Sequence, residues 1–576
     1  MRNAEIADAM AELATLYELD GAIRYRVLAY REAARVIRQS PVSVEELALA
    51  GKATELPGIG ETLQTKIVAL VETGEIPSAT KLKAKYPASL VEVTRIPGLG
   101  AKTVRRLYDE LGVSTLDDLR AAAEEQRIRD LKGLGPKAEE NVIAALATLG
   151  EKGPAERLLL SQALPVAEEL AAALRAHPDS DAVTVAGSAR RRAETCKDID
   201  LIATARDPKQ LAIALTEHEL VAQAGSAGAS GTRVTTYNGL SVDLRIVEPD
   251  AYGNLLQHFT GSAKHNVELR ERALRDGLSV SEHGITDEES GEVTRYRTEG
   301  EVYARLGLAY IEPELREGGG ELAAAAADEL PELVELADIR GDLHCHTTLS
   351  DGRNTLEEMA EAARARGYTY LAVTDHSASH GFGNHVTADA LRGRIEEVAA
   401  CNAASKRRFR LLAGSEVNIG TDGSLDYADD LLAELDWVIA SVHTSFRISP
   451  KEMTKRVVAA IENPRVDCIG HLTGRLIGRR EPYEIDVEAV AEAAAANRTL
   501  LEINGNPNRR DLSERHARLA AEAGVGICVN TDAHGVDTLS NIVYGVATAR
   551  RGWLTRKQVA NTRSWRELLK LRGRSI

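Results

Sequence analysis

Asp342-Leu343-His344-Cys345-His346 closes the first of seven short apolar runs between residues 340 and 534, and every run ends in side chains that can bind a metal ion. Helix-like stretches rich in Ala, Glu, Arg and Leu separate the runs, and this alternation predicts a (β/α) barrel with parallel strands. In such a barrel the C-terminal ends of the strands meet on one open face. Their imidazoles and carboxylates would supply ligands for Zn²⁺ or Mn²⁺. The other six runs end at Thr374-Asp375-His376, Ser415-Glu416, Val442-His443, Gly470-His471, Glu502-Ile503-Asn504 and Thr531-Asp532-Ala533-His534.

The length and composition indicate several domains and no membrane anchor. A chain of 576 residues is too long for one core, so roughly three to five domains are expected. It contains no run of about 18 apolar residues that could span a bilayer. Residues 1–10 form an amphipathic polar segment rather than a signal peptide. The five cysteines lack a CxxC pair, which predicts a cytoplasmic location without disulfides.

The net charge of −16 does not exclude a DNA-binding protein, because the acidic residues are unevenly distributed. Residues 301–350 hold 11 Asp and Glu against 3 Lys and Arg. Residues 551–576 hold 8 basic residues and a single acid. Acidic side chains that bind metal ions also lose their charge once the ions are bound. The overall charge therefore excludes neither nucleic acids nor small molecules as substrates.

Three similar turns occur in the first 150 residues, each with the pattern apolar-x-Gly-apolar-Gly and each followed by a predicted helix. The glycines permit a tight turn and a close approach of the backbone to a ligand, and the helix N-terminus behind them can bind an anion. The pattern resembles the helix-hairpin-helix motif, which grips DNA phosphates without reading bases. A plain helix connection is the alternative, but three copies, with Lys102, Arg105 and Arg106 after the second, favour DNA. The turns are Leu56-Pro57-Gly58-Ile59-Gly60, Ile96-Pro97-Gly98-Leu99-Gly100 and Leu131-Lys132-Gly133-Leu134-Gly135.

A second candidate metal site lies in the middle of the chain. Asp198 and Asp200 are two residues apart on a predicted strand, so both carboxylates point to one face. A further predicted strand, residues 240–246, can place Asp243 beside them. Three carboxylates can hold two Mg²⁺ or Mn²⁺ ions, as nucleotidyl transfer to a 3′-hydroxyl requires. Upstream, Gly187-Ser188 would offer an amide and a hydroxyl to phosphates, and Arg191 a fixed cation.

Gly187-Ser188-Ala189-Arg190-Arg191, Asp198-Ile199-Asp200 and Phe259-Thr260-Gly261-Ser262 together resemble the family X DNA polymerases. The resemblance implies metal-ligand roles for the three aspartates and triphosphate contacts for Gly187, Ser188 and Arg191. It implies that Phe259 and Gly261 lie against the sugar of the incoming nucleotide, Asn266 at its base and Arg270 at the template strand. His258 stands where the family usually has tyrosine, which puts discrimination against ribonucleotides in question.

The same resemblance extends to the N-terminal region. Lys66 falls where the beta-like relatives keep the lysine that forms a Schiff base with 5′-deoxyribose phosphate, a role that requires partial desolvation. An ordinary exposed lysine is the alternative. Arg26, Tyr30 and Arg31 are candidate contacts for the 5′-phosphate at a gap.

Residues 339–576 resemble the polymerase-and-histidinol-phosphatase (PHP) domain. The resemblance implies a trinuclear site that would hold up to three Mn²⁺ or Zn²⁺ ions and hydrolyse phosphoesters. Some relatives keep the barrel only as a scaffold, so a metal-binding but purely structural domain is the alternative. A complete ligand set favours retained chemistry. The nine ligand positions are filled by His344, His346, Asp351, His376, Glu416, His443, His471, Asp532 and His534.

The whole chain thus resembles the bacterial members of family X, which implies a monomeric enzyme acting on gapped or primed DNA and dNTPs. The implied activities are gap filling in base excision repair, trimming of 3′ ends and incision of abasic sites. A small-molecule phosphatase fused to another nucleotidyltransferase and a non-catalytic DNA-binding scaffold are the competing interpretations. The predicted fold is multidomain α/β: a helical lyase-like domain (1–80), helix-hairpin-helix fingers (81–150), an α+β palm (151–250), a thumb (251–317), an acidic linker (318–338) and a distorted (β/α)7 barrel (339–576).

Overall fold

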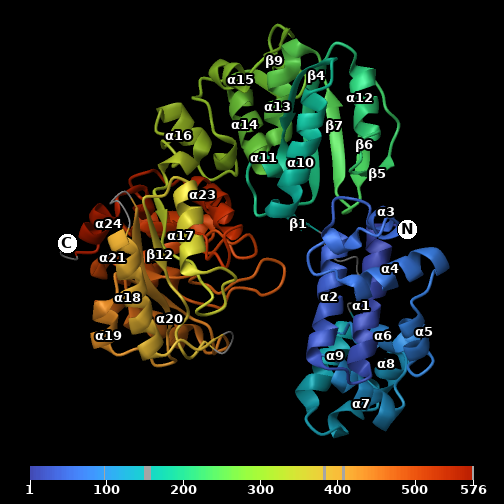
Figure 1. Ribbon diagram of the computed structural model, residues 1–576. Coiled ribbons are helices and arrows are strands. Elements are labelled where there is room, and N and C mark those ends of the chain that lie inside the picture. The colour runs from blue at the N-terminus through green and yellow to red at the C-terminus, as the bar shows by residue number, and fades with distance from the viewer. Residues whose placement is uncertain (97, 148–156, 381–383, 405–408, 574–576) are drawn as a thin grey trace. The chain divides into compact units, whose positions relative to one another are not determined.

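The computed structural model describes residues 1–96, 98–147, 157–380, 384–404 and 409–573 (Figure 1). Contacts divide the chain into two compact units. The first contains Met1–Leu158, Pro165–Val185 and Lys197–Val247, and the second contains Leu159–Leu164, Ala186–Cys196 and Glu248–Ile576. Residues 186–196, which the sequence places in the palm, therefore pack within the second unit. Among the described residues, no helix has the length and apolarity needed to cross a bilayer.

The N-terminal part of the first unit is helical, as predicted. Each helix turns an apolar face inward, so that Met10, Leu13, Ile37, Val104 and Leu107 lie in one buried core. The three glycine turns connect helices in this region and precede α4, α7 and α9. The helices are α1 (Asn3–Leu19), α2 (Arg24–Gln39), α3 (Val44–Leu49), α4 (Glu61–Thr73), α5 (Pro77–Lys83), α6 (Ala88–Val93), α7 (Ala101–Leu111), α8 (Leu116–Glu124) and α9 (Pro136–Ala147).

The rest of the first unit is built on a five-stranded sheet in the order β2-β4-β7-β6-β5. Strands β4 and β7 are parallel, whereas the other neighbours are antiparallel. Ile199 and Leu201 of β4 are fully buried, and the alternating Asp198 and Asp200 lie on the opposite face. The elements are α10 (Leu160–Arg175), β2 (Ser180–Val185), β4 (Asp198–Ala205), α12 (Pro208–Thr216), β5 (Val221–Ala224), β6 (Gly231–Thr236) and β7 (Ser241–Ile246).

The second unit contains the predicted thumb, residues 251–317. Its helices pack with a small antiparallel sheet in the order β10-β9-β8. Leu269, Tyr303 and Ile311 lie in the buried core of this region. The predicted phosphate-binding segment begins with a short helix, α11 (Gly187–Arg190). The other elements are α13 (Tyr252–Thr260), α14 (Ala263–Arg275), β8 (Leu278–Ser281), β9 (Gly284–Asp287), β10 (Val293–Thr294), α15 (Glu299–Arg305) and α16 (Glu321–Ala327).

The acidic segment expected to act as a linker is folded against the thumb. Leu322 and Leu333 belong to the thumb's buried core. Glu321, at the start of α16, is fully buried, and its Oε1 lies 2.7 Å from Nδ1 of His265. Residues of this acidic segment therefore make specific contacts with the thumb, and the segment is not an extended spacer.

The C-terminal part is the predicted barrel. Its seven parallel strands follow one another in chain order, and a parallel bridge between Cys345 and Ala533 joins the segments that follow the first and last strands. Leu343, Tyr370, Trp437 and Cys528 belong to a buried cluster of strand side chains. The strands are β11 (Gly341–Asp342), β12 (Tyr370–Val373), β13 (Arg410–Asn418), β14 (Trp437–Ser441), β15 (Cys468–Ile469), β16 (Leu500–Asn504) and β17 (Ile527–Asn530).

Helices pack around these strands, and α18, α20 and α21 are the longest of them. Their apolar faces share a second buried cluster with the strands, which includes Met359, Val457 and Ala549. The sheet thus holds the strand ends in fixed register, so side chains after each strand are carried to the same end of the barrel. The helices are α17 (Leu356–Ala365), α18 (Ala388–Ala404), α19 (Asp429–Glu434), α20 (Pro450–Glu462), α21 (Val487–Asn497), α22 (Glu514–Glu522), α23 (Ile542–Arg551) and α24 (Trp565–Leu571).

Candidate metal centre and candidate polymerase site

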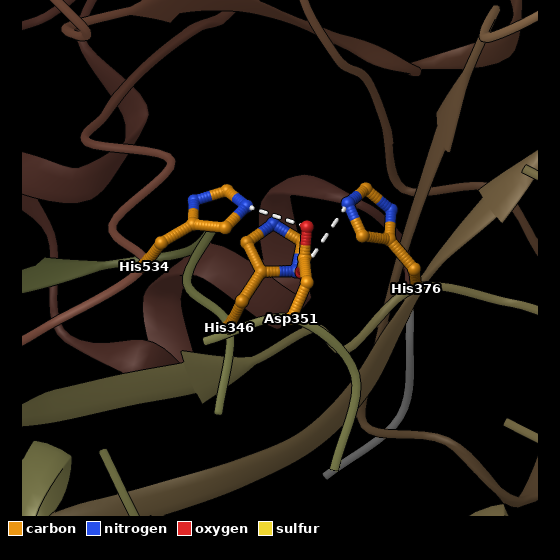
Figure 2. A group of neighbouring side chains, drawn as sticks. All are labelled: His346, Asp351, His376 and His534. Atoms are coloured by element: carbon orange, nitrogen blue, oxygen red, sulfur yellow. Dashed lines mark ion pairs between the residues drawn. The ribbon is translucent and has the colours of Figure 1, made fainter. Parts of the chain in front are cut away.

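The barrel brings all nine predicted ligand residues together at the C-terminal ends of its strands. Three overlapping groups have ligand atoms within 4.8 Å of one another. In the group shown in Figure 2, Asp351 lies among three imidazoles. Its carboxylate oxygens are 3.4 Å from Nε2 of His534, 3.7 Å from Nε2 of His376 and 4.0 Å from Nδ1 of His346. These separations leave room for a shared cation between the ligand atoms.

Glu416, at the inner end of β13, is the hub of the other two groups. Its Oε2 lies 2.8 Å from Nδ1 of His376 and 3.3 Å from Nε2 of His344. Its Oε1 lies 2.9 Å from Nε2 of His471 and 3.3 Å from Nε2 of His443. Asp532 completes the set, with its Oδ1 3.1 Å from Nε2 of His346. His346 is a fifth neighbour, with its Nε2 3.6 Å from Oε2 of Glu416. One buried carboxylate thus faces five imidazoles, an arrangement suited to binding metal ions.

The charges of the centre fit divalent cations. Burial alone would raise the pKa of Glu416 and of Asp532, but the surrounding histidines, His344 first, hold both well below their ordinary values. Burial opposes protonation of His534, yet Asp351 and Asp532 raise its pKa to about 9. Burial and the neighbouring His534 lower the pKa of His346 to about 4. The buried site thus contains ionised carboxylates beside both neutral and protonated imidazoles. Bound divalent cations would neutralise the negative charge of these carboxylates.

Several ligand atoms are also incompletely satisfied by the protein. Nε2 of His344, Nδ1 of His346 and Oε2 of Glu416 are buried and have charged side chains of the centre within 4.0 Å, but among the described residues none of them makes a hydrogen bond of ordinary geometry. Buried polar atoms are normally satisfied, and an ion is a recognised reason when they are not. The donor set of imidazoles and carboxylates therefore fits divalent metal ions.

Glu502, in β16, contacts two ligand residues on the side away from the centre. The sequence prediction did not assign it a role. Its Oε1 lies 2.8 Å from Nδ1 of His344 and accepts a hydrogen bond from Asn530 at 2.9 Å. Its Oε2 accepts from the backbone N–H of His471 at 2.8 Å. A carboxylate on Nδ1 fixes the ring so that Nε2 faces the centre. The sequence feature that could have identified Glu502 is its place in Glu502-Ile503-Asn504, at the end of one of the seven apolar runs.

The three predicted polymerase carboxylates lie on adjacent strands of the first unit. Asp200 of β4 is the direct register partner of Asp243 on β7, and Asp198 is two residues from Asp200 on the same face. Asp243 is not free: its Oδ2 accepts hydrogen bonds from Arg233 at 2.6 Å and Arg245 at 3.2 Å. A divalent ion bound there would have to displace or rearrange these arginines.

In the second unit, the predicted nucleotide contacts of the thumb are tied to one another. Gln257 donates to Oδ1 of Asn266 at 2.9 Å, and Asn266 donates to the carbonyl of His258 at 2.8 Å. Arg270 lies 3.2 Å from Nδ1 of His258. Burial lowers the pKa of His258, so its ring is mostly neutral at pH 7.

The Arg191 side chain contacts the same thumb. It donates to the carbonyl of Thr260, and the space beside Gly261 is filled by the Arg191 guanidinium, which a Cβ there would meet at 3.1 Å. A side chain at Gly261 would also be strained, because its φ is +67°. The ring of Phe259 is tilted by 60° to that of His258, with the ring centroids 5.2 Å apart. The motif residues 187–191 and 258–270 therefore form one assembled region, whereas the three aspartates lie in the other unit.

The glycine turns have the geometry that the sequence predicted. Gly58, Gly98 and Gly133 adopt left-handed φ angles of 78°, 86° and 87°. Gly60 and Gly100 are the N-caps of α4 and α7, and a Cβ at either would meet nothing within 4 Å, so a ligand can approach the backbone. The third turn has the same open space at Gly135.

The basic residues near these turns are more constrained than expected. Arg105 donates to the carbonyl of Leu19 at 2.9 Å, and Arg106 donates to the carbonyl of Lys132 at 2.8 Å. Both thus connect neighbouring helices in addition to any role with DNA. Lys66 is half-buried and donates to Oγ of Ser78 at 2.9 Å.

The candidate 5′-phosphate contacts on α2 also have internal partners. Tyr30 is buried with its ring 5.1 Å from that of Tyr17, and burial raises its pKa. Arg26 lies over the Tyr17 ring at 5.4 Å, and Arg31 pairs with Glu18. These three residues are close together in the fold, but each would have to keep or exchange a contact on binding a phosphate.

Family models of known proteins match four segments of the chain. Residues 1–76 match a helix-hairpin-helix domain and residues 90–148 a SAM-like helix-hairpin-helix tandem. Residues 255–317 match the DNA polymerase beta thumb, and residues 342–506 match the PHP domain. The matches define a beta-like polymerase joined to a PHP domain.

Individual relatives narrow the class. The chain is 39% identical over 573 residues to the DNA polymerase/3′-5′ exonuclease PolX of Bacillus subtilis (strain 168), covering 99% of each protein. The chain therefore belongs to the family X DNA polymerases, in the form that carries a C-terminal PHP domain. A probable phosphatase of Thermoanaerobacter sp. (strain X514) is 34% identical over 240 residues, which is 38% of this chain and 89% of that protein. A probable phosphatase of Caldicellulosiruptor saccharolyticus is 31% identical over 207 residues, 34% of this chain and 79% of that protein.

Proposed function

We propose that this chain is a DNA-directed DNA polymerase that fills short gaps in DNA repair and that its barrel trims 3′ ends as a metal-dependent 3′-5′ exonuclease. The observation that carries the proposal is the presence of two separate ligand sets in one chain. Asp198, Asp200 and Asp243 lie on adjacent parallel strands. The barrel set includes His346, Asp351, His376 and His534. The end-to-end similarity to the Bacillus subtilis polymerase and exonuclease supports both activities.

Divalent ions, when bound, would activate the attacking hydroxyl or water and neutralise phosphate charge. The protein's own part in the polymerase reaction is to bind and orient. Asp198, Asp200 and Asp243 would hold two Mg²⁺ or Mn²⁺ ions. The amide of Gly187, the Ser188 hydroxyl and the Arg191 guanidinium would bind the triphosphate. The helix-hairpin-helix turns would hold the phosphates of gapped or primed duplex DNA without selecting bases.

In the barrel, nine side chains would hold up to three Mn²⁺ or Zn²⁺ ions, and Glu502 would keep His344 in the tautomer that presents Nε2. The relatives named as probable phosphatases support phosphoester hydrolysis by this part of the chain. Incision at abasic sites is a further reaction of the same class. The chain would act as a monomer in the cytoplasm.

One labelled gapped duplex tests both activities together. Extension should require dNTPs with Mg²⁺ or Mn²⁺, whereas shortening should occur without dNTPs and respond most to Mn²⁺. Extension with no shortening in any metal would leave the barrel as a metal-binding scaffold. Hydrolysis of a chromogenic phosphomonoester without extension would favour a small-molecule phosphatase instead.

Lys66 would form the Schiff base in removal of a 5′-deoxyribose phosphate. Its half-buried amine and its contact with Ser78 supply partial desolvation. Borohydride should trap a covalent adduct with wild-type protein and none with Lys66→Ala, using Lys52→Ala as a control. Trapping that persists in Lys66→Ala would assign the amine to another residue.

His258 would weaken selection for deoxyribose, because an imidazole replaces a larger phenol beside Phe259. The ratio of deoxynucleotide to ribonucleotide incorporation should rise several-fold in His258→Tyr. An unchanged ratio would remove His258 from sugar selection.

A further inference from the structure

The guanidinium of Arg191 is held from two sides. Its Nη1 donates to the Thr260 carbonyl of the thumb, and its Nε donates to Oε1 of Glu317 at 2.9 Å. Only 14% of the Arg191 side chain is exposed. With Nε and one N–H of Nη1 engaged, the guanidinium is held in one orientation, and the two N–H groups of Nη2 remain to donate.

Glu317 in turn connects Arg191 to the barrel. The same Oε1 accepts from Nη1 of Arg551, the last residue of α23, at 2.8 Å. Arg551 also donates to the backbone carbonyl of Arg191 at 2.9 Å, and its other terminal nitrogen binds Glu514 at 2.8 Å. Arg551 is 7% exposed. Side chain and backbone of Arg191 are therefore both fixed by one buried barrel residue.

Two more barrel residues hold the segment that follows Arg191. Arg510 donates to the carbonyl of Arg192 at 3.0 Å, and Arg475 pairs with Glu194. Arg510 is 1% exposed and also donates to Oγ1 of Thr548 at 2.8 Å. The barrel thus supports the whole segment 191–194 through three arginines.

We infer that Glu317 and Arg551 are positioning residues of the polymerase reaction, so that the PHP barrel is built into the nucleotide-phosphate site. The inference rests on the proposed role of Arg191 in binding the triphosphate. A pre-oriented guanidinium loses less rotamer freedom when it binds phosphate, which strengthens binding without new contacts. Glu317 is the last residue of the predicted thumb and directly precedes the segment predicted as an acidic linker.

The competing explanation is electrostatic. Glu317 places a negative charge beside Arg191 and could weaken the attraction for a triphosphate. Arg551 offsets this charge, because its guanidinium contacts the same Glu317 oxygen. The two explanations predict opposite changes in nucleotide affinity, so substitutions at Glu317 separate them.

Steady-state filling of a one-nucleotide gap by the full-length protein tests the inference. Glu317→Ala and Arg551→Ala should each raise the KM for dNTP by about 10-fold and change kcat much less, as expected for lost pre-organisation. Glu317→Gln keeps an oxygen acceptor and should restore most of the wild-type KM. Arg550→Ala is the matched control, because the neighbouring Arg550 contacts Glu314 and the Val334 carbonyl instead.

The outcomes separate this inference from the proposed function. A lower KM in both Glu317 variants would assign Glu317 as a competing charge and overturn positioning. A wild-type KM in Arg551→Ala, or an equal rise in Arg550→Ala, would overturn the specific role of the barrel. If Arg191→Ala itself leaves the KM unchanged, the triphosphate role of Arg191 fails, and the inference fails with it. Retained metal-dependent shortening of DNA in each variant confirms that the protein is folded.

Discussion

The two candidate metal sites of this chain differ in how completely the fold assembles them. In the barrel, Glu416 is buried with five imidazoles around it, and all nine ligands lie on or after strands of one continuous sheet. In the polymerase part, Asp198 is exposed and Asp243 is engaged by two arginines. The nine barrel ligands all lie in the second unit, whereas the three aspartates lie in the first unit and residues 187–191 in the second.

This difference has a physical reason. A nuclease that hydrolyses one bond can keep a rigid, pre-formed centre whose buried ligands are oriented by neighbours such as Glu502. A polymerase must admit a new nucleotide and move along DNA in each cycle, so its carboxylates stay accessible until the substrates arrive. The comparison predicts that the two activities can be removed one at a time.

Asp243→Ala gives the largest expected effect. Nucleotide incorporation should fall by about 1,000-fold or more, because the proposed metal pair loses a ligand shared between adjacent strands. Primer extension and shortening of the same labelled duplex measure the two activities. Shortening should stay near wild type, and Asp181→Ala on the neighbouring strand β2 should change neither activity. Loss of both activities in folded Asp243→Ala protein would contradict two independent sites.

His346→Ala should produce the reciprocal result. His346 contributes to two of the three ligand groups, so its loss should reduce 3′-5′ shortening by about 100-fold or more while extension continues. Metal analysis of the full-length protein should show fewer bound Mn²⁺ or Zn²⁺ ions. His516→Ala, in a barrel helix outside the ligand set, is the control. Unchanged shortening by metal-depleted His346→Ala protein would place the nuclease elsewhere.

Glu502→Gln should weaken the centre by a smaller amount. Gln cannot bring a charged acceptor to Nδ1 of His344, so Mn²⁺ affinity should fall by about 10-fold to 100-fold, as for other residues behind metal ligands. Titration with Mn²⁺, followed by its magnetic resonance signal, measures the affinity directly. Asp467→Asn removes an equally buried carboxylate that pairs with Arg572 instead, and it should leave the affinity unchanged. Equal losses in both variants would indicate general destabilisation of the barrel.

Periodicity made much of the barrel predictable. His344 and His346 are two residues apart after an apolar run, and their shared face follows from strand geometry. The same rule predicted that Asp198 and Asp200 share a face. Their placement beside Asp243 followed from the predicted strand at residues 240–246. Such features depend on local spacing, which the sequence displays directly.

Partners that are distant in sequence were not predictable in the same way. Glu317 and Glu321 belong to an acidic run, yet one contacts Arg551 and the other His265 across long sequence separations. Arg105 and Arg106 follow a DNA-binding pattern, yet their guanidinium groups reach carbonyls of other helices. Charge in a sequence does not reveal burial or partner, because both are set by packing.

The thumb depends on a buried charge cluster, and the last prediction concerns its stability and not an activity. Glu299 is 6% exposed and binds two arginines: its oxygens lie 2.6 Å from Nη2 of Arg190 and 2.5 Å from Nη1 of Arg316. Arg316 is fully buried and lies over the rings of Tyr303 and Tyr310 at 5.1 and 5.4 Å. Burial alone would raise the pKa of Glu299, but Arg316 and Arg190 lower it below the ordinary value of 4.5.

Because the folded-state pKa of Glu299 is depressed, its stabilising contribution is present above about pH 4.5 and is lost as the pH falls through the folded-state value. Glu299→Gln should lower the free energy of unfolding by about 3 kcal/mol at pH 7, since the buried Arg316 and the partly buried Arg190 lose their counter-charge. The deficit should shrink on acidification below pH 4.5, where wild-type Glu299 also becomes neutral. Calorimetry of both proteins across pH measures this, with exposed Glu288→Gln as the control. A deficit that is the same at pH 7 and at pH 3 would mean that side-chain packing, and not charge, explains the role of Glu299.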